Sequence, residues 1–543
     1  MSPRVPGLGG WRRLGALLAL LGLALAGAAR AESPAVQVEA GRRIYLEGVL
    51  PDGTPLRGFR PGAGEVSGRL AACANCHRRS GMGGVEGVSV APPLAGGLLF
   101  SPPPPRREAR VRHAAGMRFQ DYPHQTRPAY DRALLARALR QGVGAGGETF
   151  GLLMPRYVLS DGEVDALSAY LRSLPVGVAP GVTDEAVHFA TVVAPDADPA
   201  QTRAMLDVLE RCIPAQSPRG ADSRAWRWQV WRVQGPRALW EAQLDEHYRR
   251  QPVLALVAGI SGGDWAPVQR FAERARVASL YPAVQVVGEG GEPYFSFYTW
   301  PGLALEGRVV AARLLDGEPP RRVRQVFRPG RDGEVAARAL AEALAPGATR
   351  VEDWPLPAGP LAPRAAERAV EGQQPGEALV LWLEGDDLAA LTAQPPPPGV
   401  AVFASATLAG LERAPVGNAW RPAIRLVYPF EPEARRLGRM VLNVGGWLAD
   451  RGLALDRATE RVQGAAYSTC EMLGRAMRGM GGQYSPDYLL EWLENSVEGA
   501  LAMPFPRFTL GPGQRFGSKG AYLMRYVPPG LERLEPDGEW IVP

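Results

Sequence analysis

The pentapeptide Cys73-Ala74-Asn75-Cys76-His77 is the strongest chemical signal in the 543-residue chain. Its spacing places both thiols on one side of a helical turn, with the imidazole directly after them. Thiols in this arrangement can add to the two vinyl groups of one haem, and the histidine can then bind the iron. The pentapeptide therefore predicts one covalently attached haem c, anchored by Cys73 and Cys76 and ligated by His77.

A Cys-x-x-Cys pair can instead bind zinc or act as a redox-active disulfide. A tetrahedral zinc site needs two further ligands, and the chain, with 4 Cys and 5 His, contains no second closely spaced pair. Thioredoxin-like pairs lie in βαβ units, a pattern that this segment lacks. Both alternatives are therefore weaker than haem attachment.

A haem that carries electrons, rather than binding a substrate, needs a sixth iron ligand. Met154 precedes a segment in which Ser160 and Glu163 have the spacing of a helix-capping box. By its position, Met154 is the predicted ligand. The alternatives are Met82, Met117, His113 and His124.

Residues 36–176 resemble a class I cytochrome c domain. The resemblance rests on the haem motif, on Gly41-Arg42-Arg43-Ile44-Tyr45 as the opening helix, on Pro92-Pro93-Leu94-Ala95-Gly96 as the loop beside the proximal histidine, and on Met154 before the last helix. It implies an all-α domain with Met154 as distal ligand. It also implies an electron carrier, not an enzyme, with a dehydrogenase or an oxidase as redox partner. An insertion at 97–129 departs from the family pattern.

The N-terminus has the pattern of a secretory signal peptide. Residues 1–31 combine a basic start, a short apolar stretch and a small-x-small cleavage site, which predicts a periplasmic protein with no membrane span after cleavage. Cleavage would remove four Arg and no acidic residue, and would lower the formal net charge from +5 to +1. A nearly neutral mature chain does not favour nucleic-acid binding.

The rest of the chain is expected to be a separate α/β domain. At about 100 to 200 residues per domain, the length requires more than one domain, and the Pro- and Gly-rich residues 177–186 predict a linker. From 187 to 543, short β-rich segments alternate with amphipathic helical ones. The predicted strands are 187–193, 228–234, 253–258, 322–327, 378–383, 400–403 and 424–428; the predicted helices are 200–212, 236–249 and 264–276, with a helical segment at 431–494. This alternation predicts two α/β lobes with mostly parallel sheets.

Residues Leu254–Val268 and Val277–Pro282 resemble type I periplasmic solute-binding proteins of the branched-chain amino acid kind. In that family a strand runs into a Gly/Ser turn and a helix, where N–H groups and hydroxyls can hold a carboxylate. The resemblance implies that Ser261 and Gly262 contact an amino acid or another small organic ligand. It also implies that Tyr281 and Tyr298 line the opposing side of the cleft.

The same turn, Gly259-Ile260-Ser261-Gly262-Gly263, has the G-x-S-x-G pattern of a hydrolase. A hydrolase of that kind needs a histidine after the serine, and all 5 His precede Ser261. The other two cysteines, Cys212 and Cys470, either pair or remain single.

These patterns predict an exported c-type cytochrome that carries electrons through one His/Met-ligated haem. The fused solute-binding-like domain would dock a partner or sense a small molecule. The alternative is a periplasmic ligand sensor whose haem responds to the ligand. A haem-dependent oxidoreductase is the third hypothesis, although the single haem motif opposes a dihaem peroxidase.

Overall fold

The computed structural model describes residues 33–86, 89–102, 127–175, 177, 179–218, 223–288, 293–495 and 502–543. The predicted signal peptide lies outside the described residues, as do His113, Met117 and His124. The described residues up to 175 form one compact unit, here the N-terminal unit, and those from 177 onward form a second, the α/β unit. Among the described helices, none is both long and apolar enough to cross a membrane.

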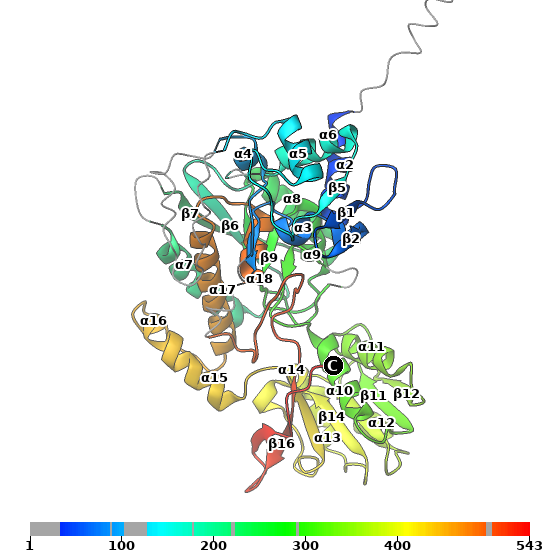
Figure 1. The fold of residues 1–543 in the computed structure, drawn as a ribbon. Helices are drawn as coiled ribbons and strands as arrows, with labels where there is room; N and C mark the ends of the chain where they lie inside the picture. The colour runs from blue at the N-terminus through cyan, green and yellow to red at the C-terminus, as the bar shows by residue number, and fades with distance from the viewer. Residues whose placement is uncertain are drawn as a thin grey trace, which may run out of the picture. The chain divides into compact units, whose positions relative to one another are not determined.

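The N-terminal unit consists mainly of short helices joined by loops (Figure 1). The helices are α2 (Pro34–Glu47), the 3-10 helix η1 (Gly68–Ala71), α3 (Ala74–His77), α4 (Gly96–Leu99), α5 (Arg132–Gln141) and α6 (Asp161–Ser173). The N–H of Glu163 donates to the Ser160 hydroxyl, and the N–H of Ser160 donates to the Glu163 carboxylate. This capping box satisfies two free N–H groups and sets the start of α6, as the sequence predicts.

Helix α2 crosses α6 at Gly41. A Cβ atom added to Gly41 would lie 2.0 Å from the carbonyl oxygen of Ala166 and 2.7 Å from the Cβ of Tyr170. Beside the crossing, the rings of Tyr45 and Tyr170 pack with centroids 5.3 Å apart. Only glycine permits this approach, so the first and last helices of the unit close over a shared hydrophobic core.

Two small antiparallel sheets add to the helical fold expected for this unit. One has the order β2 (Gly64–Ser67), β1 (Arg57–Arg60), β5 (Arg156–Val158); the other pairs β3 (Gly84–Glu86) with β4 (Ser89–Ala91). Each strand has four residues or fewer. Such strands are too short for the alternation of polar and apolar residues to be recognised in the sequence.

The first lobe of the α/β unit is built on a parallel sheet. Its strand order is β10 (Ser296–Phe297), β9 (Ala278–Leu280), β8 (Ala255–Val257), β6 (Ala186–Val193), β7 (Ala225–Arg232), and every neighbouring pair is parallel. The helices are α7 (Pro199–Gln216), η2 (Arg237–Leu239), α8 (Trp240–Arg250) and α9 (Ala266–Ala275). Loops at the carboxyl ends of these strands therefore meet at one edge of the sheet.

The second lobe has a mixed sheet with a parallel core. Its order is β12 (Arg350–Pro355), β11 (Arg322–Phe327), β13 (Ala378–Trp382), β14 (Ala401–Ser405), β15 (Ile424–Tyr428), β16 (Tyr522–Val527), β17 (Arg533–Pro536). Only the pairs made by β16 are antiparallel. The helices are α10 (Leu303–Leu315), α11 (Gly333–Leu344), α12 (Pro363–Val370), α13 (Gly385–Thr392), α14 (Ala406–Ala409) and η3 (Leu411–Arg413). The predicted α/β fold with mostly parallel sheets is confirmed.

A helical segment follows the second lobe, as predicted. It comprises α15 (Glu433–Met440), η4 (Val441–Gly445), α16 (Gly446–Ala449), α17 (Glu460–Gly479) and α18 (Pro486–Glu494). Helix α17 lies beside α7 (Figure 1), and Cys470 of α17 forms a disulfide with Cys212 of α7. The sequence left this pairing open, and the bond fastens the late helices to the first lobe.

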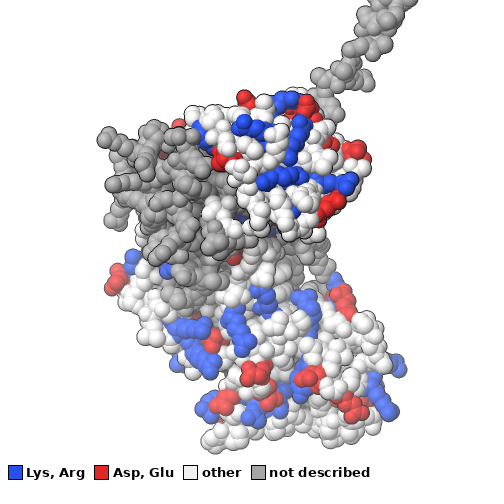
Figure 2. Space-filling model, viewed as in Figure 1, with Lys and Arg blue, Asp and Glu red and all other residues white. Residues whose placement is uncertain are grey.

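Charged side chains of both signs are interspersed over the face of the α/β unit that Figure 2 shows. Phosphate backbones are bound by contiguous basic patches. The described residues on this face present no such patch.

Candidate functional site

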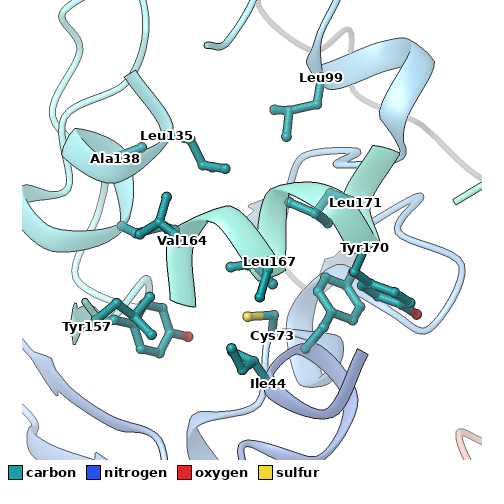
Figure 3. Close-up of a cluster of buried hydrophobic side chains, with 14 of the residues drawn as sticks. Ile44, Cys73, Leu99, Leu135, Ala138, Tyr157, Val164, Leu167, Tyr170 and Leu171 are labelled. Carbon is teal, nitrogen blue, oxygen red and sulfur yellow. The ribbon is translucent and has the colours of Figure 1, made fainter. Parts of the chain in front are cut away.

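The haem motif of the N-terminal unit, Cys73–His77, follows η1 and forms α3, with Cys73 as the N-cap residue of that helix. Cys73 and Cys76 are both free thiols. Cys73 is buried beside Ile44, Tyr157 and Leu167 (Figure 3), and burial raises the pKa of its thiol to about 12. Cys76 is exposed. Both cysteines are thus thiols available for addition to a vinyl group, one at the wall of the core and one at the surface.

His77 is held in the tautomer that an iron ligand requires. Its Nδ1 lies 2.9 Å from the carbonyl oxygen of Pro92, which can only accept a hydrogen bond. Nδ1 therefore carries the proton, and Nε2 keeps its lone pair in the neutral ring. His77 is 5% exposed, and this burial lowers its pKa, against the hydrogen bond to Pro92, which raises it. Burial is the larger effect and favours the neutral imidazole, while the hydrogen bond to Pro92 keeps its proton on Nδ1 and leaves Nε2 free to bind a metal.

Two tyrosine hydroxyls fix the backbone on either side of the motif. The Tyr45 hydroxyl donates to the carbonyl of Arg78 at 2.8 Å, and the Tyr157 hydroxyl donates to the carbonyl of Ala71 at 3.0 Å. The sequence analysis assigned no such role to either tyrosine. A buried phenol needs a hydrogen-bond partner, so a tyrosine at an apolar position can be expected to donate a hydrogen bond within the core. The sequence does not show which carbonyl accepts that bond.

Met154 is partly buried and packs against the same hydrophobic cluster as the haem motif. Met82 also packs there, so the packing alone does not choose between the two methionines. The loop that carries Met154 is held by Arg156. The guanidinium group of Arg156 donates to the carbonyl oxygens of Met154 and Phe150.

These residues fit a haem c group. The fit rests on the free thiols, the imidazole with Nε2 as acceptor and the apolar wall around Cys73. Apolar side chains also flank the motif and the Met154 loop in the sequence: Leu70 is 73% exposed, Leu152 is 66% exposed and Leu153 is 59% exposed. Contact with an apolar macrocycle would remove such side chains from water.

In the α/β unit, the predicted ligand residues Ser261 and Gly262 lie after β8, at the carboxyl end of the sheet. Their donors already have an acceptor in the chain. The Ser261 hydroxyl donates to Asp196 Oδ1 at 3.0 Å, and the N–H of Gly262 donates to the same oxygen at 3.1 Å. The sequence analysis missed Asp196, which is 65 residues away and gives no local signal.

Tyr281 and Tyr298 do not line an exposed cleft. Tyr281 is 2% exposed and packs against Phe297 and Phe508; Tyr298 is 1% exposed and donates to Gln269 Oε1 at 2.6 Å. Large aromatic side chains at the ends of buried parallel strands gain more by packing into the lobe core than by facing water. Both side chains therefore belong to the buried core of this lobe.

Comparison with known proteins identifies the N-terminal unit. Residues 69–175 match the model of the family described as Cytochrome c. The matched segment contains the haem motif and Met154, which confirms the resemblance inferred from the sequence. No curated protein matches the chain.

Several solved structures are similar to the α/β part of the chain. A branched chain amino acid ABC transporter from Thermus thermophilus, solved with bound valine, has 12% identity and a TM-score of 0.48, covering 66% of this chain and 97% of its own. A leucine-binding protein from Thermotoga maritima has 11% identity and a TM-score of 0.45, covering 66% and 99%. A substrate-binding protein from Aeropyrum pernix has 13% identity and a TM-score of 0.48, covering 66% and 97%.

Proposed function

We propose that this chain, whose residues 69–175 form a cytochrome c domain, is an exported periplasmic electron carrier with one covalently bound haem. The observation that carries the proposal is the environment of His77. A buried, neutral imidazole whose Nδ1–H is given to Pro92 is what a proximal iron ligand requires. It directly follows two free cysteines with the spacing of haem attachment.

In this proposal each residue has one task. The Cys73 and Cys76 thiols add across the two vinyl groups, so that each sulfur forms a carbon–sulfur bond and its hydrogen goes to the neighbouring vinyl carbon. His77 Nε2 and the Met154 sulfur would be the two side-chain ligands of the iron. The bound haem supplies a one-electron couple between ferric and ferrous iron.

The surroundings of the ligands favour electron transfer over substrate turnover. Ligation by two side chains leaves no iron position for a substrate, and a His/Met pair gives a higher reduction potential than two nitrogen ligands. The bond from Nδ1–H to the Pro92 carbonyl fixes the ring orientation and makes Nε2 a stronger donor. The redox partner would be a dehydrogenase or an oxidase of the same compartment.

The test compares two methionines of the same domain. Met154→Ala and Met82→Ala are made in the holoprotein, because both side chains pack against the haem-motif cluster. We expect only Met154→Ala to abolish the far-red methionine-to-iron absorption band and to lower the reduction potential. Loss of the band in Met82→Ala, with the band retained in Met154→Ala, would contradict the assignment. Intact mass measurement, which detects one added haem, checks covalent attachment in both variants.

A second function is favoured by the two-lobed α/β unit, whose first lobe brings the carboxyl ends of five parallel strands to one edge of the sheet. Loops at such an edge commonly bind small molecules. We propose that this unit binds a small organic ligand. A thermal-shift screen of the holoprotein tests this proposal, because a ligand at 100 times its dissociation constant stabilises by about 2.7 kcal/mol. A blank across amines, amides, alcohols and acids would contradict ligand binding and leave partner docking.

A further inference from the structure

The turn between β8 and α9, residues 259–264, carries hydrogen-bond donors of the kind that hold a carboxylate. It follows a strand end and precedes a helix of ten residues. Ile260 in this turn bridges to Val193 at the end of β6, so the turn lies next to the β6–α7 loop. We call its donors, the Ser261 hydroxyl and the N–H of Gly262, together with the side chain of Arg237, the anion seat.

Asp196 of the β6–α7 loop occupies the anion seat. Its Oδ1 accepts hydrogen bonds from the Ser261 hydroxyl at 3.0 Å and from the N–H of Gly262 at 3.1 Å. Its Oδ2 accepts a hydrogen bond from Arg237 Nη2 at 2.7 Å. One carboxylate with a hydroxyl, an amide and a guanidinium around it has the set of partners that a free carboxylate ligand would need.

Two more backbone donors in and after the turn are used within the chain. The N–H of Gly263 donates to the Ser261 hydroxyl at 3.3 Å, and the N–H of Ala266, at the start of α9, donates to Asp264 Oδ1 at 2.8 Å. A ligand carboxylate would have to displace Asp196 to reach the Ser261 hydroxyl and the N–H of Gly262.

Two glycines let Asp196 and Arg237 approach the turn. A Cβ atom on Gly262 would lie 2.3 Å from the carbonyl oxygen of Asp196, and a Cβ atom on Gly263 would lie 2.2 Å from Arg237 Nη2. The backbone of Asp196 and the guanidinium of Arg237 thus occupy space that any other residue in the turn would fill. The close approach of the Asp196 backbone to Gly262 makes the position of Asp196 part of the fold of this lobe, whereas the Arg237 guanidinium is the end of a flexible side chain.

Electrostatics oppose a second carboxylate at this position. Partial burial raises the pKa of Asp196, but the hydrogen bonds from Arg237, Gly262 and Ser261 outweigh it and leave the pKa below its usual value, so the side chain is ionised at neutral pH. Burial raises the pKa of Asp332, at the start of α11; the charge of Arg237 lowers it, and the charges of Glu384, Asp196 and Asp264 raise it further. An anionic ligand beside these groups would meet like charge.

We propose that Asp196 determines the ligand class of the α/β unit: it fills the anion seat, so the unit does not bind amino acids or other small molecules through a carboxylate. The inference rests on the proposed binding of a small molecule by this unit. It restricts that ligand to compounds that dock through neutral or cationic groups.

The experiment uses the holoprotein and two probes that differ in one group, L-valine and L-valinamide, with acetate as a minimal carboxylate. Binding is measured by thermal shift and by calorimetric titration. We expect no carboxylate binding by the unaltered chain. Asp196→Ala frees three donors and should raise the affinity for acetate and L-valine at least tenfold, without the same gain for L-valinamide.

Two further variants make the result specific. Asp198 lies in the same loop as Asp196. Asp198→Ala removes only the N-cap contact of α7, a hydrogen bond from the N–H of Gln201, and should not increase the affinity for carboxylates. Ser261→Ala in the Asp196→Ala background should lose the gain. Asp196→Ser also removes the carboxylate and tests the proposal if the alanine variant does not fold.

Two outcomes overturn the proposal. One is binding of L-valine by the unaltered chain, and the other is no gain of carboxylate affinity in folded Asp196→Ala or Asp196→Ser. Failure of the wider proposal is a separate result, because ligand binding as such is judged on the unaltered chain against the full panel of compounds.

Discussion

Replacing Arg156 tests how the proposed distal ligand is held. The Arg156 guanidinium donates to the carbonyl oxygens of Met154 and Phe150, and it lies against Gly142, where an added Cβ would be 1.9 Å from its Nε. A hydrogen bond from a charged donor contributes about 1.5–3 kcal/mol. Because Arg156 is only half-buried, we use the lower value, and the two bonds then contribute about 3 kcal/mol to the order of this loop.

The change is Arg156→Met, which removes both bonds and keeps an unbranched stem. If half of the lost free energy, about 1.5 kcal/mol, comes from destabilising the state with Met154 bound to iron, the population without that bond rises about tenfold. External imidazole binds only to that population, so its apparent dissociation constant should fall by the same factor. The assay titrates ferric holoprotein with imidazole and follows loss of the far-red absorption band.

Arg140→Met is the matched control. Arg140 donates to the carbonyl of Leu159 at 2.9 Å and to Asp161 at 2.7 Å, which is the same chemistry outside the Met154 loop. Its imidazole affinity should stay within about twofold of the unaltered protein, which corresponds to less than about 0.5 kcal/mol. Equal affinities in Arg156→Met and the unaltered protein would refute the role of Arg156.

Three further predictions concern stability. Gly41→Ala should lower the free energy of unfolding by about 1–3 kcal/mol in urea titrations, because its Cβ overlaps the backbone of α6. Gly162→Ala, with open space around the new Cβ, should raise that free energy by about 0.5–1 kcal/mol. Equal effects of the two changes would contradict the close crossing of α2 and α6. Replacing Cys212 and Cys470 by Ser should cost about 2–5 kcal/mol in the α/β unit, and a reductant should reproduce this loss only in the unaltered chain. Burial raises the pKa of Glu306 to about 7 from 4.5, so its contribution to stability is complete below about pH 4.5 and is lost as the pH rises through 7. The free energy of unfolding of Glu306→Gln, relative to that of the unaltered chain, should therefore increase by about 3 kcal/mol between pH 4.5 and 8. A difference between the two proteins that does not change with pH would disprove this.

The fold could be predicted where the sequence repeats a pattern over enough residues. The predicted strands at 322–327 and 424–428 coincide with β11 and β15, because both are buried β-rich segments of five or six residues. The strands of the N-terminal unit were missed because each pairs over four residues or fewer. Their pairing depends on residues far apart in the chain, such as Gly58 opposite Tyr157, and not on local preference.

The candidate site residues could likewise be predicted only where the pattern lies within a short stretch of sequence. The haem motif is contiguous, so residue type and spacing were enough to propose Cys73, Cys76 and His77 as haem-binding residues. The Pro92 carbonyl that orients His77 belongs to a loop already noted beside the motif. Ser261 was also found from its turn, but the sequence could not reveal that Asp196 fills it, because that contact depends on the parallel pairing of β6 and β8.

In the proposed holoprotein the four cysteines form two kinds of bond, and their spacing in the sequence separates the two pairs. Cys73 and Cys76 meet in an unfolded chain at little entropic cost, whereas the bond between Cys212 and Cys470 closes a loop with a sequence separation of 258. That second pair meets once α7 packs against α17. Haem attachment needs reduced thiols, and the disulfide needs oxidised ones. Both are satisfied if haem is attached before the first lobe of the α/β unit folds, because a reductant that keeps Cys73 and Cys76 as thiols then acts when Cys212 and Cys470 are still apart.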